Sequence, residues 1–280
     1  MPVLSRLVDI YESRGFRVSS GLNPVHFDNY ALAPSTWLIK EGSSYTNGLG
    51  IGLQEVYFLE CLFADFNPKN IFIIGNSLGW STVALSLINA KANVVAIDDG
   101  SDKNALEGIT FTNTIAAEEG LSLKVVQGRS PEDVGPAIDN NFQEPVDFVF
   151  IDGCHTNDHI VIDFKAIQAK ASPDCVYLFH DVHQFKLDDG FNRILTDSGL
   201  TGRILLSTPS GVGIAFNPNS TPAVARAIEA FDIDEEALAV IEKEAWQARH
   251  RHRTRYRRSL IKRLNSLRRL FGLEAKPLDK

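Results

Sequence analysis

Two short segments of the sequence place carboxylate and imidazole side chains directly after runs of apolar residues. One contains Asp152 and His155, and the other is the adjacent pair His180 and Asp181. If the segments lie side by side, Asp152 and Asp181 point into one cleft, where two carboxylates repel each other unless a cation or a proton lies between them. Oxygen ligands of this kind suit Mg²⁺, Mn²⁺ or Ca²⁺. We therefore predict a divalent metal site on Asp152 and Asp181, with His180 as a nitrogen ligand or as a residue that orients the site.

His155 follows Asp152 by three residues and is the candidate general base of this site. Imidazole titrates near neutral pH, so its nitrogen can take a proton from a reacting group at physiological pH. A single residue of this kind would be interpreted as a cap of a strand end. Four titratable residues in two segments favour a functional site, and Asp152 and His155 are the residues predicted to carry the chemistry.

A glycine-containing turn after an earlier apolar run is the second candidate site. Its sequence over residues 75–82 is G-N-S-L-G-W-S-T. Glycine permits a tight turn and the close approach of a ligand to the backbone. A dinucleotide-binding turn has the pattern G-x-G-x-x-G, and counted from Gly75 this pattern fails at Ser77 and Trp80. A nicotinamide or flavin dinucleotide is therefore disfavoured as the ligand.

Two further polar positions follow the next apolar runs. Asp98 lies about 20 residues beyond the glycine turn, the separation that one strand-helix-strand unit requires, and its carboxylate could accept hydrogen bonds from ribose hydroxyls. Asp99 is a close alternative, and a helix-capping or turn aspartate is the other interpretation of Asp98. Ser130 lies in the turn after the third run, where an ordinary solvated turn is nearly as good an explanation.

The runs that precede these residues are short, apolar and rich in β-branched side chains, so they predict strands. They lie at 71–74, 94–97, 123–126, 148–151 and 175–179, with helical patterns between them at about 81–90, 103–119, 158–171 and 187–198. Continuous apolar strands indicate a parallel sheet that is buried on both faces. The alternation predicts an α/β fold with a doubly wound, Rossmann-like, mostly parallel sheet. Ligands bind outside the carboxyl ends of such strands, where all the candidate residues lie.

The flanking segments complete the expected organisation. Residues 203–207 and 211–216 predict a closing antiparallel hairpin. Residues 24–50 are loop-like, and their place before the first strand of the sheet suggests part of a lid over the active site. The expected divisions are an N-terminal helical and lid segment over 1–66, a cofactor-binding core over 67–218, and a helical extension with a basic tail over 219–280.

Composition limits the class of protein. Of the 280 residues, 44% are apolar, enough for one substantial α/β domain with extensions. No run approaches the ~20 apolar residues of a membrane span, and the first residues show no apolar signal region. The cysteines Cys61, Cys154 and Cys175 show no C-x-x-C spacing, which disfavours a disulfide framework or a zinc site. These features predict a cytoplasmic protein.

Charge is divided unevenly along the chain. Residues 249–269 contain ten Lys or Arg and no acid, and because the whole chain carries −7, the remaining residues sum to −17. Nucleic acid is disfavoured as a substrate, since the acidic main body would repel it. The basic tail has Leu260, Leu264, Leu267 and Phe271 at helical spacing. Such a helix could contact an anionic membrane surface, at the inner face of the membrane, or another subunit. A solvated or oligomer-packing helix is the alternative.

Taken together, residues 71–182 resemble the class I S-adenosylmethionine-dependent O-methyltransferases. The nearest branch has an I-D-G-x-H segment, here at 151–155, and an H-D or E-D pair after the next strand, here at 180–181. This branch is similar to macrolide-sugar O-methyltransferases and to cephalosporin hydroxylase-like proteins. The resemblance extends at most over residues 54–216 and includes the order of strands and the G-x-x-x-G turn.

The resemblance implies S-adenosylmethionine as the cofactor and a divalent cation such as Mg²⁺. It implies a ribose contact at Asp98, an adenine-side contact at Ser130, and a cofactor contact at Asp152. It implies metal ligands at Asp152 and Asp181, with His155 as the base. The remaining implied cofactor contacts lie in the glycine turn, at Gly75, Asn76, Ser77, Gly79 and Ser81.

The function predicted from this resemblance is methylation of a hydroxyl group on a small molecule or sugar. Two positions depart from the family pattern, since members often have Glu where His180 stands and an acid where Ile73 stands. One alternative is an enzyme of the same fold that uses the metal site for other chemistry, as the hydroxylase-like resemblance allows. The other is a binding or scaffold protein that has lost catalysis.

Overall fold

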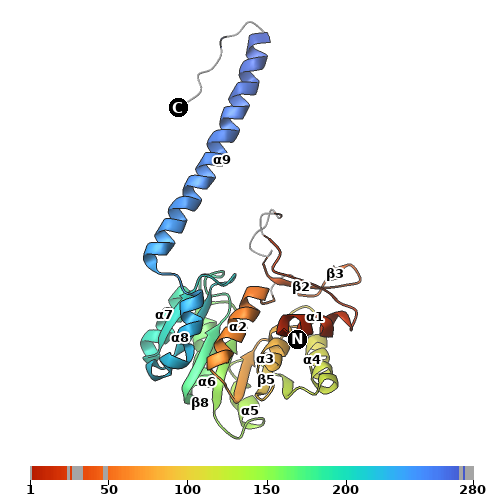
Figure 1. The fold of residues 1–280 in the computed structure, drawn as a ribbon. Coiled ribbons are helices and arrows are strands. Elements are labelled where there is room, and N and C mark those ends of the chain that lie inside the picture. Colours follow the sequence, from red (N-terminus) through yellow and green to blue (C-terminus); the bar gives the residue numbers. More distant parts are fainter. Residues whose placement is uncertain (1, 24–25, 27–33, 47–49, 271–273, 275–280) are drawn as a thin grey trace. The chain divides into compact units, whose positions relative to one another are not determined.

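The structure is a computed structural model that describes residues 2–23, 26, 34–46, 50–270 and 274 (Figure 1). The side chains at positions 249, 251–258 and 270 also lie outside the description. The chain forms two compact units, Met1–Asp232 and Ile233–Lys280. Each unit is described by itself below.

The first unit is built around a seven-stranded sheet with the order β6-β5-β4-β7-β8-β10-β9. In chain order the strands are β4 (Asn70–Ile74), β5 (Asn93–Asp98), β6 (Leu123–Gln127), β7 (Val146–Ile151), β8 (Ala171–Phe179), β9 (Thr201–Leu205) and β10 (Val212–Phe216). The strands from β6 to β8 in that order pair in parallel, whereas β10 is antiparallel to both β8 and β9. The predicted Rossmann-like sheet with a closing antiparallel hairpin is therefore confirmed.

The apolar runs form strands because both faces of the sheet are covered. All five residues of β4 are buried, and alternate side chains of a strand point to opposite faces. Ile71 and Ile73 belong to one hydrophobic core, whereas Phe72 and Ile74 belong to the other. A strand between two cores has no polar face to show, so its sequence is a continuous apolar run.

Helices from both sides complete these cores. The first core contains residues of α1 (Val3–Glu12), α2 (Leu53–Asp65), α3 (Trp80–Ile88), α4 (Ala105–Glu119) and α8 (Thr221–Phe231). The second contains residues of α5 (Val134–Asp139), α6 (Asn157–Gln168) and α7 (Asp188–Ser198). A short 3₁₀ helix, η2 (Pro218–Ser220), precedes α8. Helix α5 is absent from the sequence prediction, because its six residues include Gly135 and Pro136 and are too few to show a helical period.

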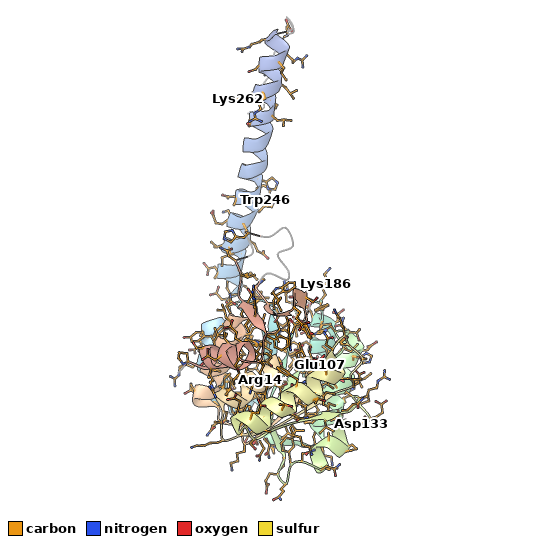
Figure 2. The ribbon with its side chains drawn as sticks, turned by 90° about the vertical axis from the view of Figure 1, so that its right-hand side faces the viewer. Arg14, Glu107, Asp133, Lys186, Trp246 and Lys262 are labelled. Carbon is orange, nitrogen blue, oxygen red and sulfur yellow. The ribbon has the colours of Figure 1, made fainter. Side chains whose placement is uncertain are left out.

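The segment before α2 differs from the prediction. Helix α1 ends at Glu12, and the chain then forms a three-stranded antiparallel sheet in the order β1 (Arg17–Ser20), β2 (Thr36–Lys40) and β3 (Ser43–Ser44). Strands of four, five and two residues are too short to display a clear alternation. The turn between α1 and β1 contacts α4, because the guanidinium of Arg14, labelled in Figure 2, lies 2.9 Å from the carboxylate of Glu119. Of the expected lid over 24–50, residues 24–25, 27–33 and 47–49 lie outside the described residues.

The second unit contains the 36-residue helix α9 (Glu235–Leu270). Figure 2 labels Trp246 and Lys262 on this helix, and the Trp246 ring stacks on His250 at a centroid distance of 3.8 Å. Leu260, Leu264 and Leu267 are each about half exposed, at 48%, 50% and 53%. None of the helices in the described part of the chain is long and apolar enough to span a membrane.

Candidate active site

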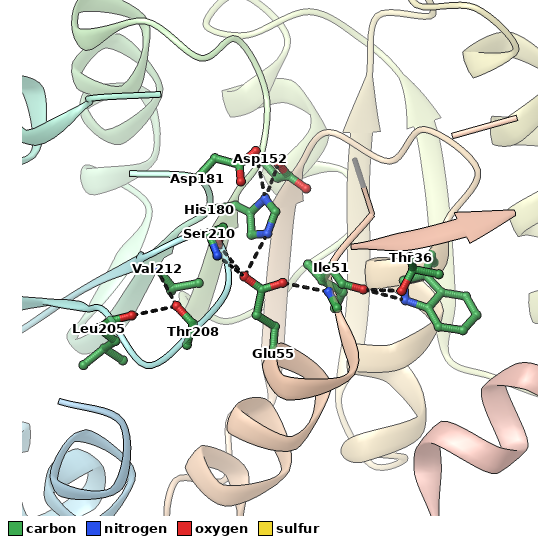
Figure 3. Close-up of polar contacts among 12 residues, drawn as sticks. Thr36, Ile51, Glu55, Asp152, His180, Asp181, Leu205, Thr208, Ser210 and Val212 are labelled. Atoms are coloured by element: carbon green, nitrogen blue, oxygen red, sulfur yellow. Dashed lines mark hydrogen bonds and ion pairs between the residues drawn. The ribbon is translucent and has the colours of Figure 1, made fainter. Parts of the chain in front are cut away.

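The loops after β7 and β8 bring four titratable side chains together. Because Ile151 pairs with Phe179 in the parallel β7–β8 ladder, the residues that follow leave the sheet at the same edge. One ligand atom from each of Asp152, His155, His180 and Asp181 lies within 4.8 Å of the others. We call these four residues the Asp-His cluster; part of it is shown in Figure 3.

Each carboxylate of the Asp-His cluster lies close to both imidazole rings. Nε2 of His155 is 3.4 Å from Oδ1 of Asp152 and 3.2 Å from Oδ2 of Asp181. Nδ1 of His180 is 3.1 Å and 3.4 Å from the same two oxygens. The side chains of His180 and Asp181 are almost fully buried, whereas the side chain of His155 is 25% exposed.

These contacts shift the ionisation of all four groups. Burial lowers the pKa of His155, but its contacts with Asp152 and Asp181 outweigh burial and raise the pKa to about 9. For His180, burial has the same opposing effect, and the neighbouring carboxylates again raise the pKa well above its usual value. Burial would raise the pKa of both aspartates, but the imidazoles, His180 first, lower it. Without a cation, the nearby carboxylates therefore favour the protonated form of both imidazoles.

The Asp-His cluster has a donor set that fits a divalent cation. Carboxylate oxygens suit Mg²⁺ and Mn²⁺, and imidazole nitrogens shift the preference toward transition metals. Nε2 of His155 is buried and makes no hydrogen bond to any part of the chain that the structure describes, although it faces both carboxylates. A cation between the carboxylates would replace the imidazolium charge, and His155 would then be free to accept a proton.

Backbone geometry also marks this edge of the sheet. Asp181 has a φ of +58°, in the left-handed region that residues with a side chain rarely adopt. Such conformations cost about 1–3 kcal/mol each and persist where the surrounding structure imposes them. Four residues later the ring of Phe185 stacks on His155, with centroids 4.5 Å apart. The turn after β8 therefore places both a carboxylate and an aromatic wall against the candidate base.

Glu55, on α2, is a buried neighbour of the Asp-His cluster that sequence reasoning missed. Its Oε1 lies 3.3 Å from Nε2 of His180, on the opposite side of the ring from the aspartates (Figure 3). The local pattern contains a signal, because an acid at the third position of a helix can accept a hydrogen bond from the backbone N–H of the N-cap residue, here Gly52. Nothing local indicates the second contact, which spans more than a hundred residues of sequence.

A pocket of about 690 Å³ opens beside the Asp-His cluster, within the size range of small-molecule and cofactor sites. It is lined by the loops after β4, β5, β6 and β7, and Asp152 and His155 belong to both the pocket and the cluster. Of the predicted cofactor residues, those that line the pocket are Gly75, Asn76, Ser77, Ser81, Asp98, Ser130 and Asp152.

Gly79 is the predicted cofactor residue that does not line the pocket. It precedes α3 with a φ of +80°, and a Cβ there would lie 2.1 Å from Oγ1 of Thr112. A side chain at this position would collide with α4, so the close approach of that helix requires glycine here. Gly75 also has a positive φ, of +94°, and a Cβ there would lie 2.1 Å from the carbonyl oxygen of Asp152. The glycine turn is thus packed tightly against the β7 loop.

Asp98 organises the glycine turn from β5. Its Oδ2 accepts hydrogen bonds from the backbone amides of Asn76 and Ser77, each at 2.8 Å, and its Oδ1 accepts one from Gly100 at 2.9 Å. A carboxylate has about four acceptor sites, so little capacity remains for ribose hydroxyls. Asp99, which also lines the pocket, is more exposed. The alternative role for Asp99 therefore stays open.

Ser130 is tied to a buried acid that the sequence analysis did not select. Its hydroxyl donates a hydrogen bond to Oδ1 of Asp163, on α6, and both residues line the pocket. Burial raises the pKa of Asp163, and the Ser130 hydroxyl partly offsets this. In the glycine turn, Oδ1 of Asn76 is buried and has no hydrogen-bond partner among the described residues. The pocket thus offers acceptors that a ligand could satisfy.

Sequence comparison finds a family match in the central part of the chain. Residues 72–182 match a family model described as a methyltransferase domain. No curated protein sequence matches the chain. The matched segment begins in β4 and ends just after the Asp-His cluster, so it contains most of the pocket and the whole cluster.

Solved methyltransferases have a similar fold. An O-methyltransferase from Bacillus cereus, in complex with S-adenosylhomocysteine, is 17% identical with a TM-score of 0.50, over 60% of this chain and 83% of that one. The O-methyltransferase TomG from Streptomyces achromogenes, involved in tomaymycin synthesis and in complex with S-adenosylmethionine, is 16% identical with a TM-score of 0.50, over 78% and 90%. An S-adenosylhomocysteine-bound methyltransferase from Podospora anserina is 14% identical with a TM-score of 0.51, over 77% and 88%.

At these identities the structural likeness establishes the fold, and residues 72–182 match the model of a methyltransferase domain. The expectation of a class I methyltransferase is thereby confirmed at the level of fold and domain.

Proposed function

We propose that this chain, which contains a methyltransferase domain over residues 72–182, transfers the methyl group of S-adenosylmethionine to a hydroxyl oxygen of a small molecule or sugar. The observation that carries the proposal is the continuity of the cofactor-sized pocket with the Asp-His cluster, which share Asp152 and His155. A methyl donor in the pocket and an activated hydroxyl at the cluster would be neighbours. The buried Oδ1 of Asn76, which has no hydrogen-bond partner among the described residues, supports a ligand in the glycine turn.

Methyl transfer forms a carbon–oxygen bond on the acceptor as the carbon–sulfur bond of the donor breaks, and the bonding electron pair stays on sulfur. A divalent cation held by Asp152, His180 and Asp181 would lower the pKa of the acceptor hydroxyl. The imidazole of His155 takes the proton of that hydroxyl, and Phe185 restrains the imidazole by stacking. The glycine turn orients the donor, and such positioning supplies a large part of the rate.

Calorimetric titration with S-adenosylhomocysteine, with and without Mg²⁺, tests this function. Binding at micromolar or lower concentration supports the cofactor assignment and justifies a screen of hydroxyl acceptors. If folded protein binds no S-adenosylhomocysteine in either condition, the methyltransferase proposal fails.

A second candidate is an enzyme of the same fold with a different metal-dependent reaction. Two imidazoles and two carboxylates include the combination of two His and one carboxylate that non-haem iron oxygenases use. Tight Fe²⁺ binding without binding of S-adenosylhomocysteine would favour this candidate. Binding of neither would favour the scaffold alternative.

We also propose that α9 contacts an anionic membrane surface, at the inner face of the membrane. Leu260, Leu264 and Leu267 lie one helical turn apart and are exposed, and Lys262 and Arg263 beside them are also exposed. The arginines of 249–258 lie outside the described side chains, so the argument from this run rests on its sequence alone. Apolar burial and attraction to anionic lipid, worth about 1 kcal/mol per Lys or Arg, would act together. We place the protein in the cytoplasm, consistent with its three free thiols.

Co-sedimentation of the full chain with vesicles tests the membrane proposal. We expect binding to phosphatidylglycerol vesicles, little binding to phosphatidylcholine vesicles, and a loss of binding when Leu260, Leu264 and Leu267 are replaced by Asn. Equal binding to both vesicles, or a leucine-dependent change of oligomeric state without vesicle binding, would overturn it, the second outcome in favour of contact with another subunit.

A further inference from the structure

Glu55 is a carboxylate with almost no exposure to solvent. The residue is 3% exposed, and the site around it is drawn in Figure 3. Its Oε2 accepts the backbone N–H of Gly52 at 2.7 Å. Its Oε1 accepts the hydroxyl of Ser210 and lies 3.3 Å from Nε2 of His180. Burying a carboxylate is costly unless it is paired, so these partners explain how the charge is tolerated.

The role of Glu55 in the helix uses only one of its two oxygens. The contact of Oε2 with the N–H of Gly52 caps the start of α2 as one half of a capping box, which would be sufficient for a structural role. Oε1 points away from the helix, toward the loop after β8 and the loop between β9 and β10. An exposed Gln or Glu would cap α2 equally well, so capping does not account for the buried contact with His180.

The imidazole of His180 lies between two sets of carboxylates. Nε2 faces Glu55, and Nδ1 faces Asp152 and Asp181. Neutral imidazole has one N–H donor and one acceptor nitrogen, and the hydrogen bond at one nitrogen decides which of the two is free. An ionised carboxylate can only accept hydrogen bonds. In the structure Nδ1 hydrogen-bonds Oδ1 of Asp152, whereas Nε2 has no hydrogen-bond partner among the described residues and faces Oε1 of Glu55 at 3.3 Å. When a cation takes the place of the proton on Nδ1, the remaining proton of the imidazole is on Nε2, beside the carboxylate of Glu55.

Helix α2 holds Glu55 at this place through the residue before Gly52. The carbonyl oxygen of Ile51 accepts hydrogen bonds from Oγ1 of Thr36 at 2.6 Å and from Nε1 of Trp80 at 3.1 Å. The start of the helix is therefore fixed to both β2 and α3. The position of Glu55 relative to the sheet edge is set by backbone contacts as well as by its own side chain.

We propose that Glu55 is a positioning residue of the candidate metal centre, which orients His180 so that Nδ1, together with Asp152 and Asp181, binds a divalent cation. This inference rests on the metal site of the proposed function and on no property of the methyl donor. Outer carboxylates that hydrogen-bond a ligating histidine fix its tautomer and its orientation, and their loss typically lowers metal affinity about 10–100-fold.

The test is the substitution Glu55→Gln, which preserves size and removes the charge. The amide oxygen is needed by the Gly52 N–H at 2.7 Å, so the amide NH₂ group would face Nε2 of His180. His180 would then accept at Nε2 and carry its proton on Nδ1, where it blocks coordination. We expect the affinity for Mn²⁺, measured by calorimetry, to fall about 10–100-fold. Binding of S-adenosylhomocysteine without metal should change by less than about twofold.

Ser210→Ala is the matched control. It removes the other side-chain partner of Oε1 and leaves the contact with His180, so the Mn²⁺ affinity should fall by less than about threefold. If Glu55→Gln binds Mn²⁺ as tightly as the unmodified protein, or if Ser210→Ala weakens binding equally, the positioning role is refuted. A failure of S-adenosylhomocysteine to bind would instead count against the methyltransferase proposal and leave this inference standing.

A measurement on the unmodified protein covers the case in which Glu55→Gln does not fold. Nitrogen-15 NMR of the Mg²⁺-loaded protein should show His180 as a neutral imidazole with its proton on Nε2. A proton on Nδ1, or a protein that binds neither Mn²⁺ nor Mg²⁺, would overturn the proposal.

Discussion

The two ends of the candidate site are held in place by different physical means. At the glycine turn, positive φ angles and close contacts fix the loop, and the carboxylate of Asp98 accepts hydrogen bonds from its backbone amides. At the Asp-His cluster, four buried or half-buried ionisable groups hold one another through charge. The first end is therefore sensitive to added side-chain volume, whereas the second depends on protons and cations. This difference gives the predictions below.

The largest expected effect is on turnover at the charged end. His155→Ala should lower kcat about 10²–10⁴-fold, because the acceptor hydroxyl loses its base. The affinity for S-adenosylhomocysteine should change little, since the glycine turn does not depend on the imidazole. Steady-state kinetics and calorimetry measure the two quantities. The matched control is His183→Ala, an exposed histidine two residues after Asp181, which should retain normal turnover. Normal turnover by His155→Ala would show that another group is the base.

At the glycine turn we expect a pair of substitutions to separate stability from binding. Gly75→Ala and Gly79→Ala both add a Cβ where φ is positive and an atom lies 2.1 Å away, so each should lower the free energy of unfolding by at least about 2 kcal/mol. Only Gly75 lines the pocket, so Gly75→Ala should weaken S-adenosylhomocysteine binding about tenfold or more, and Gly79→Ala less than about threefold. Equal losses of affinity would mean that the turn responds as one unit.

The smallest effect we expect is the pH dependence of stability in the absence of divalent cations. The pKa of His155 is raised from 6.5 to about 9, so its stabilising contribution is complete below pH 6.5 and is lost as pH rises through about 9. The pKa values of Asp152 and Asp181 are lowered, so their contribution to the free energy of unfolding is present above pH 3.8 and is lost as the pH falls below it. The protein in EDTA should therefore be most stable between about pH 4 and 6.5.

The loss for His155 between pH 6.5 and 9.5 should be roughly 1–3 kcal/mol, because it is partly exposed to solvent. Thermal unfolding across this range measures it, and His155→Gln should remove most of the fall. An unchanged fall in His155→Gln would assign the pH dependence to other groups.

How much of this molecule the sequence predicts depends on the range of the interactions involved. The runs at 71–74 and 148–151 predict their strands because burial on both faces leaves a local pattern, and the residues that follow them are located by sheet geometry. The strands at Arg17–Ser20 and Thr36–Lys40 were missed because they are short and half-buried. Glu55 was missed because the contact with Ser210 joins residues 155 positions apart. The packing of Gly79 leaves no local signal, because its packing partner, Thr112, belongs to another helix.

The contact between Gly75 and the backbone of Asp152 has a consequence for engineering. The amide of Asp152 also donates a hydrogen bond to the carbonyl oxygen of Ile74, at 2.8 Å. The glycine turn and the loop after β7 are therefore in direct contact through main-chain atoms. If one loop were replaced by the loop of a relative, this main-chain contact would have to be preserved. A loop with a different backbone would lose it, whatever its side chains. New acceptor preferences are better sought at Tyr45 and Lys103, which line the same pocket and do not belong to the two loops in contact.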